Sequence, residues 1–147
     1  MNIKDPQVQE EILTQHLAML SGSGHSMRSR AGRSGTEQAA QKLETYSCMH
    51  TLTLQATRED AMAYTGYCLQ KHPHLKQVLS DNGPQLSAVV GSGFFHLNPA
   101  ILCIEFQQMD ALCTMLHISA FAKEGLIKQK SSEKACAQFT NILLRQK

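Results

Sequence analysis

Apolar residues recur at helical spacing after two clear helix-start signals in the first half of the chain. An Asp-Pro pair at positions 5–6 offers a capping carboxylate and then proline at the favoured first helical position. The spacing that follows predicts a helix ending near residues 21–22. Thr57 opens a capping box with acidic residues in the first turn, which predicts a second helix. Pro73 should stop that helix near Lys71.

Three further helices are predicted from other local signals. A capping box at residues 34–37 predicts a helix that begins there and has one continuous side extending as far as His50. A short helix is predicted over residues 75–79, before a turn at residues 80–84. The last helix is capped by Ser131 or Ser132, and its inward stripe consists of Ala135, Cys136, Phe139, Ile142 and Leu143.

The central segment, residues 82–122, holds most of the apolar content of the chain. Across its 41 positions only Glu105 and Asp110 carry a formal charge. An Asn-Pro pair at positions 98–99 repeats the helix-start signal, and Gly125 stands where a helix end favours a left-handed residue. We therefore predict a central helix at about residues 99–123 that is apolar on most of its circumference. In the competing interpretation, residues 101–106 form a buried strand.

These elements together predict an all-α fold. The expected architecture is a compact bundle of five to seven helices around the central hydrophobic helix. A small β-hairpin near residues 86–97 stays open as an alternative to a broken helix. By length, residues 1–147 form a single domain. The Gly-, Ser- and Arg-rich stretch at residues 21–35 has almost nothing to bury, so we expect a flexible loop there.

Composition is that of an ordinary globular protein. Hydrophobic residues make up 42% and charged residues 18% of the chain, which excludes wholesale disorder, and the net charge of +2 is too small to indicate nucleic acid by itself. The N-terminus lacks the features of a secretory signal, and no apolar run reaches the roughly 20 residues that cross a bilayer. The odd number of cysteines is interpreted as free thiols in a reducing cytosol. We expect a cytoplasmic protein without membrane insertion.

Two Cys-x-x-x-His pairs are the sharpest chemical coincidence in the sequence. Cys68 with His72, and Cys113 with His117, would each share one helix face, and facing helices would then supply four ligands for tetrahedral zinc. With five cysteines and seven histidines, two such pairs also arise by chance. Packed thiols and ordinary histidines are the favoured interpretation, so no cofactor is expected. Asp110 beside Cys113 and His117 suggests thiol catalysis, but a buried helix would hold the group away from substrate.

Arg28, Arg30 and Arg33 form the best candidate contact surface. Arginine binds carboxylate or phosphate through two hydrogen bonds, and the surrounding Gly and Ser residues would let this segment adapt to a partner. A solvated linker is the simpler interpretation. Binding of nucleic acid normally adds stacking aromatic residues, and none stands between residues 1 and 43.

The favoured function is a non-catalytic protein–protein interaction module: an adaptor, a chaperone-like accessory factor or a subunit of a larger assembly. The expected partner is another protein or a second copy, because the central helix is too apolar to be covered by one slender bundle. The first alternative is a nucleic-acid-associated regulator that uses residues 28–33 and the basic C-terminal helix. The second is a metal-binding protein that uses the two Cys/His pairs.

Overall fold

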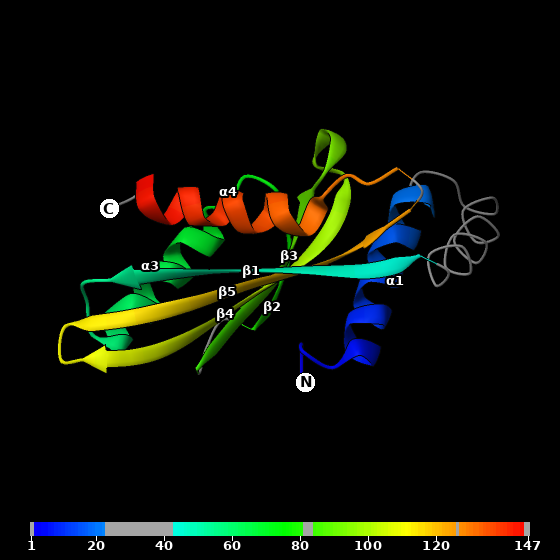
Figure 1. Ribbon diagram of the computed structural model, residues 1–147. Coiled ribbons are helices and arrows are strands. Elements are labelled where there is room, and N and C mark those ends of the chain that lie inside the picture. Colours follow the sequence, from blue (N-terminus) through cyan, green and yellow to red (C-terminus); the bar gives the residue numbers. More distant parts are fainter. Residues whose placement is uncertain (1, 23–42, 81–83, 126, 146–147) are drawn as a thin grey trace.

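A five-stranded antiparallel sheet with helices on both faces forms the protein (Figure 1). The computed structural model describes residues 2–22, 43–80, 84–125 and 127–145. The strand order is β1-β5-β4-β3-β2. The elements along the chain are α1 (Pro6–Gly22), β1 (Glu44–Leu54), α3 (Arg58–Gln70), β2 (Leu75–Ser80), β3 (Gln85–Ser92), the 3-10 turn η1 (Phe94–His96), β4 (Asn98–Asp110), β5 (Cys113–Glu124) and α4 (Ser131–Arg145).

The predicted all-α bundle is wrong, and its central helix does not exist. Residues 99–123 form most of the β4–β5 hairpin, as the competing strand interpretation of residues 101–106 required. The first seven residues of β4, from Asn98 to Ile104, are all buried, because helices cover both faces of the sheet there. A strand buried on both faces is apolar without alternating, so its periodicity resembles that of a buried helix.

Two other predicted helices are also corrected. Residues 44–50 belong to β1, and the rest of the helix expected from the capping box at 34–37 lies outside the described residues up to position 42. Residues 75–79 belong to β2. The open hairpin alternative near 86–97 is half right: β3 is a strand, but it pairs with β4, and residues 94–96 form η1. Most of the expected loop at residues 21–35 lies outside the described residues, and α1 extends to Gly22.

The three helices with clear end signals are confirmed. α1 begins at Pro6, and α3 follows Thr57, whose side chain accepts a hydrogen bond from the Asp60 backbone N–H at 3.2 Å. α3 ends at Gln70, next to the predicted stop. α4 begins at Ser131 and buries the whole predicted stripe of apolar residues. The predicted side-chain caps are present before α1 and α3, whereas α4 follows Lys130 and its Ser131 N–H bonds the Glu124 carboxylate.

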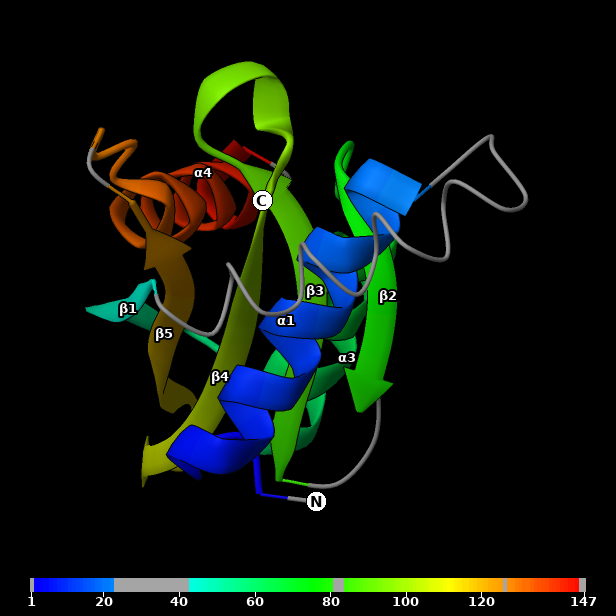
Figure 2. The same cartoon turned by 90° about the vertical axis from the view of Figure 1, so that its right-hand side faces the viewer.

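Two apolar clusters hold the helices to the sheet, one on each face. Even-numbered residues of β3, β4 and β5 pack with α3 and α4, where Phe139 and Leu143 are fully buried. Odd-numbered residues pack with the N-terminal segment and α1, in a smaller cluster that contains Ile3, Leu13, Val89, Ile101 and Cys103. α1 lies across β4 and β3 (Figure 2), and it also contacts β5, where Phe121 packs against its cluster and Lys123 pairs with Glu10.

A polar latch fixes the start of α4 to the sheet. The buried Glu124 carboxylate accepts hydrogen bonds from the backbone N–H groups of Gln129 and Ser131 at 3.0 and 2.7 Å. The Asn98 side-chain amide donates to the Ser131 hydroxyl at 2.7 Å and to the Lys123 carbonyl at 2.9 Å. Because these groups are almost inaccessible to water, each lost bond would leave an unsatisfied partner. The latch fixes α4 above β5 and β1.

Candidate interaction surface

β1 is a long edge strand with nothing paired along its outer side among the described residues. It pairs with β5 in an unbroken register from Glu44 opposite Glu124 to Leu54 opposite Thr114. The strand has 11 residues, and Glu44 is its only formally charged member. It contains neither proline nor lysine. Such an edge exposes a row of backbone N–H and C=O groups that can pair with another strand.

The opposite edge of the sheet is protected in the usual ways. β2 has only 6 residues and carries Lys76. Its pairing with β3 shifts register twice, between Leu75 and Gln77 and between Val78 and Ser80. Short length, an edge lysine and bulges all disfavour pairing with a further strand. The two edges therefore differ, and β1 is the one suited to strand addition.

α4 holds the inward side of β1 in place. Cys48 and Leu52 pack against the large apolar cluster under α4. The His50 ring nitrogen Nδ1 lies 3.4 Å from the Thr140 hydroxyl, and the Cys136 thiol donates to the Cys48 carbonyl at 3.4 Å. These contacts hold the inward-facing side chains of β1 in place. The edge strand is therefore ordered.

The other face of β1 belongs to a part of the sheet that α1 does not cover, which we call the open face. One row of opposed residues, Thr53, Met115 and Gln107, crosses it from β1 through β5 to β4. In the next row Thr51 and His117 stand in line with Glu105, whose carboxylate is paired with Lys4. Methionine is prominent, with Met49 and Met109 63% and 50% exposed. Methionine adapts its shape to many apolar surfaces. The open face consists of Met49, Thr51, Thr53, Gln107, Met109, Met115 and His117.

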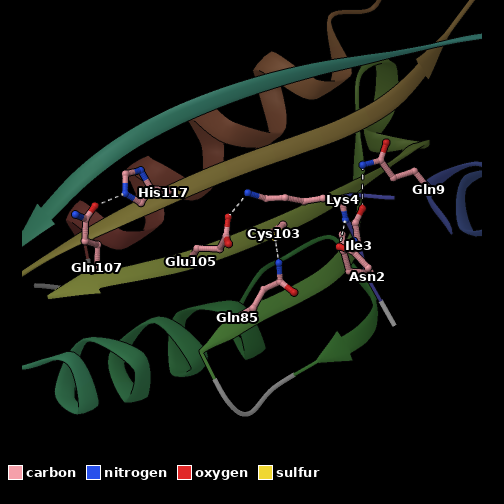
Figure 3. A network of polar contacts seen from close by, with 9 residues as sticks. All are labelled: Asn2, Ile3, Lys4, Gln9, Gln85, Cys103, Glu105, Gln107 and His117. Atoms are coloured by element: carbon pink, nitrogen blue, oxygen red, sulfur yellow. Dashed lines mark hydrogen bonds and ion pairs between the residues drawn. The ribbon is translucent and has the colours of Figure 1, made fainter. Parts of the chain in front are cut away.

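Polar contacts lie on the open face and between it and the α1 cluster (Figure 3). His117 Nε2 lies 3.0 Å from the Gln107 side-chain oxygen. Beside them Glu105 forms an ion pair with Lys4, whose pKa rises because of its hydrogen bond to that carboxylate. These polar side chains are engaged with one another and leave the methionines as the apolar contacts available to a partner.

The structure does not bring the two Cys/His pairs together. Cys68 lies in the apolar cluster under α3 and α4, whereas Cys113 and His117 lie on the opposite face of the sheet. Four residues along a strand span roughly 13 Å, so Cys113 and His117 are also far apart from each other. Among the described residues no group of three or more His, Cys, Asp or Glu side chains could hold a metal ion.

Three of the five thiols are buried and hard to ionise. Burial raises the pKa of Cys103 to about 11 and of Cys136 to about 12, and burial also raises the pKa of Cys68. A thiolate is the reactive form of cysteine, so these three groups are packing residues.

The remaining predicted contact residues lie outside this surface. Arg28, Arg30 and Arg33 fall outside the described residues. On α4, Lys134 and Arg145 line a shallow groove of about 340 Å³ together with His96. The nucleic-acid hypothesis that invoked these segments stays a prediction.

The turn at η1 is a second exposed apolar feature. Phe95 is 89% exposed, and both Phe95 and His96 have positive φ angles of 57° and 54°. The turn is held in this strained conformation by the stacking of His96 on His74, with ring centres 3.7 Å apart, and by a hydrogen bond from the Phe94 N–H to the Gln129 side chain.

Comparisons with known proteins give only remote likenesses. No family model matches the chain, and no curated protein matches it. Similar solved structures include Ara h 8.0201, with 8% identity over 69% of this chain and 94% of that one and a TM-score of 0.44. They also include a START superfamily protein from Mycobacterium smegmatis, with 12% identity over 68% of this chain and 92% of that one and a TM-score of 0.39.

Some of the similar structures are of enzymes. One of these is the Zhui aromatase/cyclase from Streptomyces sp. R1128, with 10% identity over 69% of this chain and 86% of that one and a TM-score of 0.37. Likenesses this remote assign neither a family nor an activity to the chain. Among the described residues, no helix is long and apolar enough to span a membrane.

Proposed function

We propose that the protein is a non-catalytic protein–protein interaction module that accepts a β-strand of its partner at the free edge of β1. The observation that carries this proposal is the contrast between the two sheet edges. β1 is long, regular and nearly uncharged, whereas β2 is short, bulged and carries a lysine. Natural proteins normally protect edges as β2 is protected, so an unprotected edge of this length marks a site of pairing.

The chemistry beside the edge supports the same proposal. A strand added to β1 would extend the open face, where Met49 and the threonines of β1 are exposed. Main-chain hydrogen bonds would supply much of the affinity, and alternate side chains would select the partner. Because the exposed β1 residues Met49, Thr51 and Thr53 are uncharged, they favour a partner strand with apolar and hydroxyl side chains over a charged one.

The proposal replaces the surface that the sequence suggested. The central helix that was expected to face a partner is the β4–β5 hairpin, and most of its apolar residues are already covered inside the molecule, whereas Met109 and Leu112 near its turn are exposed. The proposed interaction surface is instead the edge strand β1. The non-catalytic part of the proposal is supported by the raised pKa values of the buried thiols, which make them poor nucleophiles.

Replacing Met49 by Lys tests the proposal. The change puts a charge at the middle of the edge, where it opposes strand addition, and it leaves the inward face of β1 unchanged. Met19→Lys is the matched control, because Met19 is an exposed methionine on α1 with 49% exposure. We expect Met49→Lys to remove the associated chain, whether a copy or another protein, from the tagged full-length protein isolated from its cells.

Light scattering of the purified protein and quantitative mass spectrometry of the isolated complex are the measurements. Circular dichroism should show that both variants are folded. Equal association in Met49→Lys, Met19→Lys and the unaltered protein would show that the β1 edge is not the interaction surface.

A further inference from the structure

The outward row of β1 has the same chemistry in both directions. Its side chains are Thr45, Ser47, Met49, Thr51 and Thr53, so two hydroxyl residues flank a central methionine on each side. All five are exposed. A strand with this symmetry can face an antiparallel copy of itself with like chemistry opposite like chemistry at every position.

Antiparallel pairing centred on Met49 matches every position of this row. Thr45 then opposes Thr53 of the copy, Ser47 opposes Thr51, and Met49 opposes itself. Pairs of threonine or serine across neighbouring strands are among the combinations that stabilise sheets. The single charged residue of the strand, Glu44, falls opposite Leu54, so no two like charges meet.

The inward row and α4 fit the same arrangement. In this register Tyr46 opposes Leu52 of the copy, which is an aromatic–aliphatic pair. A strand added beyond β1 lies beside α4, which contacts β1 through Thr140. Leu144, one helical turn further along α4, is 50% exposed. An exposed leucine above the seam offers apolar contact where the two copies meet.

We propose that the strand accepted by β1 is β1 of a second copy of this chain, antiparallel and centred on Met49. The proposal rests on the function proposed above and names its partner. Twofold symmetry at Met49 makes the contact isologous, so that two copies close the interface and each protects the free edge of the other. The two five-stranded sheets then join into one continuous sheet across the pair.

Single cysteines along the outward row test both the partner and the register. Directly opposed residues of antiparallel strands have Cα atoms about 4.5 or 5.5 Å apart, and both values lie within the range that a disulfide can bridge. Met49→Cys should therefore cross-link to its own copy under mild oxidation. Residue 51 is displaced from residue 51 of the copy by four positions, or roughly 13 Å, so Thr51→Cys alone should not cross-link.

Mixing variants gives the matched control. Ser47→Cys and Thr51→Cys should each stay uncross-linked alone, and an equal mixture should give the mixed disulfide.

The experiment uses the full chain with Cys48 and Cys113, the two half-buried native thiols, replaced by Ser. Light scattering should first show that this background protein forms the same dimer as the unaltered protein. Adding Met49→Lys should raise the dimer dissociation constant by a factor of at least about 10, because two lysines then face each other.

The outcomes separate this inference from the proposed function. Cross-linking by Met49→Cys alone and by the mixed pair supports the inference. Strong cross-linking by Ser47→Cys alone or Thr51→Cys alone overturns the register. A protein that is monomeric at every concentration, but loses a different partner in Met49→Lys, overturns the second copy and leaves the proposed function intact. A monomer whose associations are insensitive to Met49→Lys refutes both.

Discussion

His72 should make the stability of the protein depend on pH in the weakly acidic range. Its ring is 5% exposed and stacks on Phe139, with ring centres 6.3 Å apart. Nδ1 accepts a hydrogen bond from the His74 backbone N–H at 3.0 Å, so the ring proton resides on Nε2. Burial, with smaller effects of His74 and His96, lowers the pKa of His72 to about 4.

The direction of the pH dependence of stability follows from which state, folded or unfolded, binds a proton at the higher pH. The unfolded chain protonates His72 near its ordinary pKa of 6.5, and the native protein does so only near pH 4. Between these values the unfolded state binds more protons, so the stability that neutral His72 contributes is fully present above pH 6.5 and is lost as the pH falls toward 4. Because a tenfold change in a proton equilibrium is worth about 1.4 kcal/mol, the loss over this shift from 6.5 to about 4 is about 3–4 kcal/mol.

Urea denaturation of the unaltered protein and of His72→Asn across this pH range measures the effect. The asparagine oxygen can accept the His74 N–H in place of Nδ1 but cannot take up a proton. We expect His72→Asn to be less stable than the unaltered protein at neutral pH, because the ring stacking on Phe139 is lost, and to show a weaker acid dependence. His16→Asn is the control, since that ring bonds the Gln77 side chain near the surface. Equal loss of stability on acidification in His72→Asn and the unaltered protein would refute this reasoning.

Three further substitutions test the packing around η1 by urea denaturation. Gly91→Ala should destabilise by about 1–3 kcal/mol, because the new Cβ would stand 2.0 Å from the His96 carbonyl oxygen; an unchanged midpoint would contradict this close approach. Asn98→Ala should cost about 1–3 kcal/mol through the two acceptors it leaves unsatisfied, and a loss well below this range would mean that water replaces the amide. Phe95→Asn should stabilise by about 1 kcal/mol, since asparagine tolerates the positive φ of 57°; destabilisation would show that the exposed ring packs on something.

Local helix-start signals predicted the helices, whereas hydrophobic periodicity did not identify the strands of the sheet. The caps before α1 and α3 were readable because a side chain bonds the first turn regardless of the rest of the fold. β3 and the first part of β4 could not be distinguished from helix, since coverage on both faces removes the alternation that identifies a strand. The Asn98-Pro99 pair wrongly predicted a helix start. The Asn98 side chain instead forms part of the latch to α4, a role that depends on the tertiary fold.

The candidate surface was only partly visible in the sequence. Alternation in β1 continues from Cys48 to Leu54, with every second residue turned inward, although a helix was predicted as far as His50. Strand order cannot be read from one sequence, so nothing indicated that β1 would lie at an edge of the sheet, beside β5. The spacing of Cys113 and His117 suggested a shared helix face, and it lost that meaning once both residues lay on β5.

Amide hydrogen exchange along β1 tests the central claim most directly. In concentrated protein the backbone amides of Glu44–Leu54 should be protected on both sides of the strand, and dilution or Met49→Lys should make every second amide exchange rapidly. The outer amides of β2 between Lys76 and Leu79 should exchange rapidly under both conditions and serve as the internal control. Rapid exchange of the outer β1 amides at every concentration, equal to that of β2, would contradict strand addition at this edge.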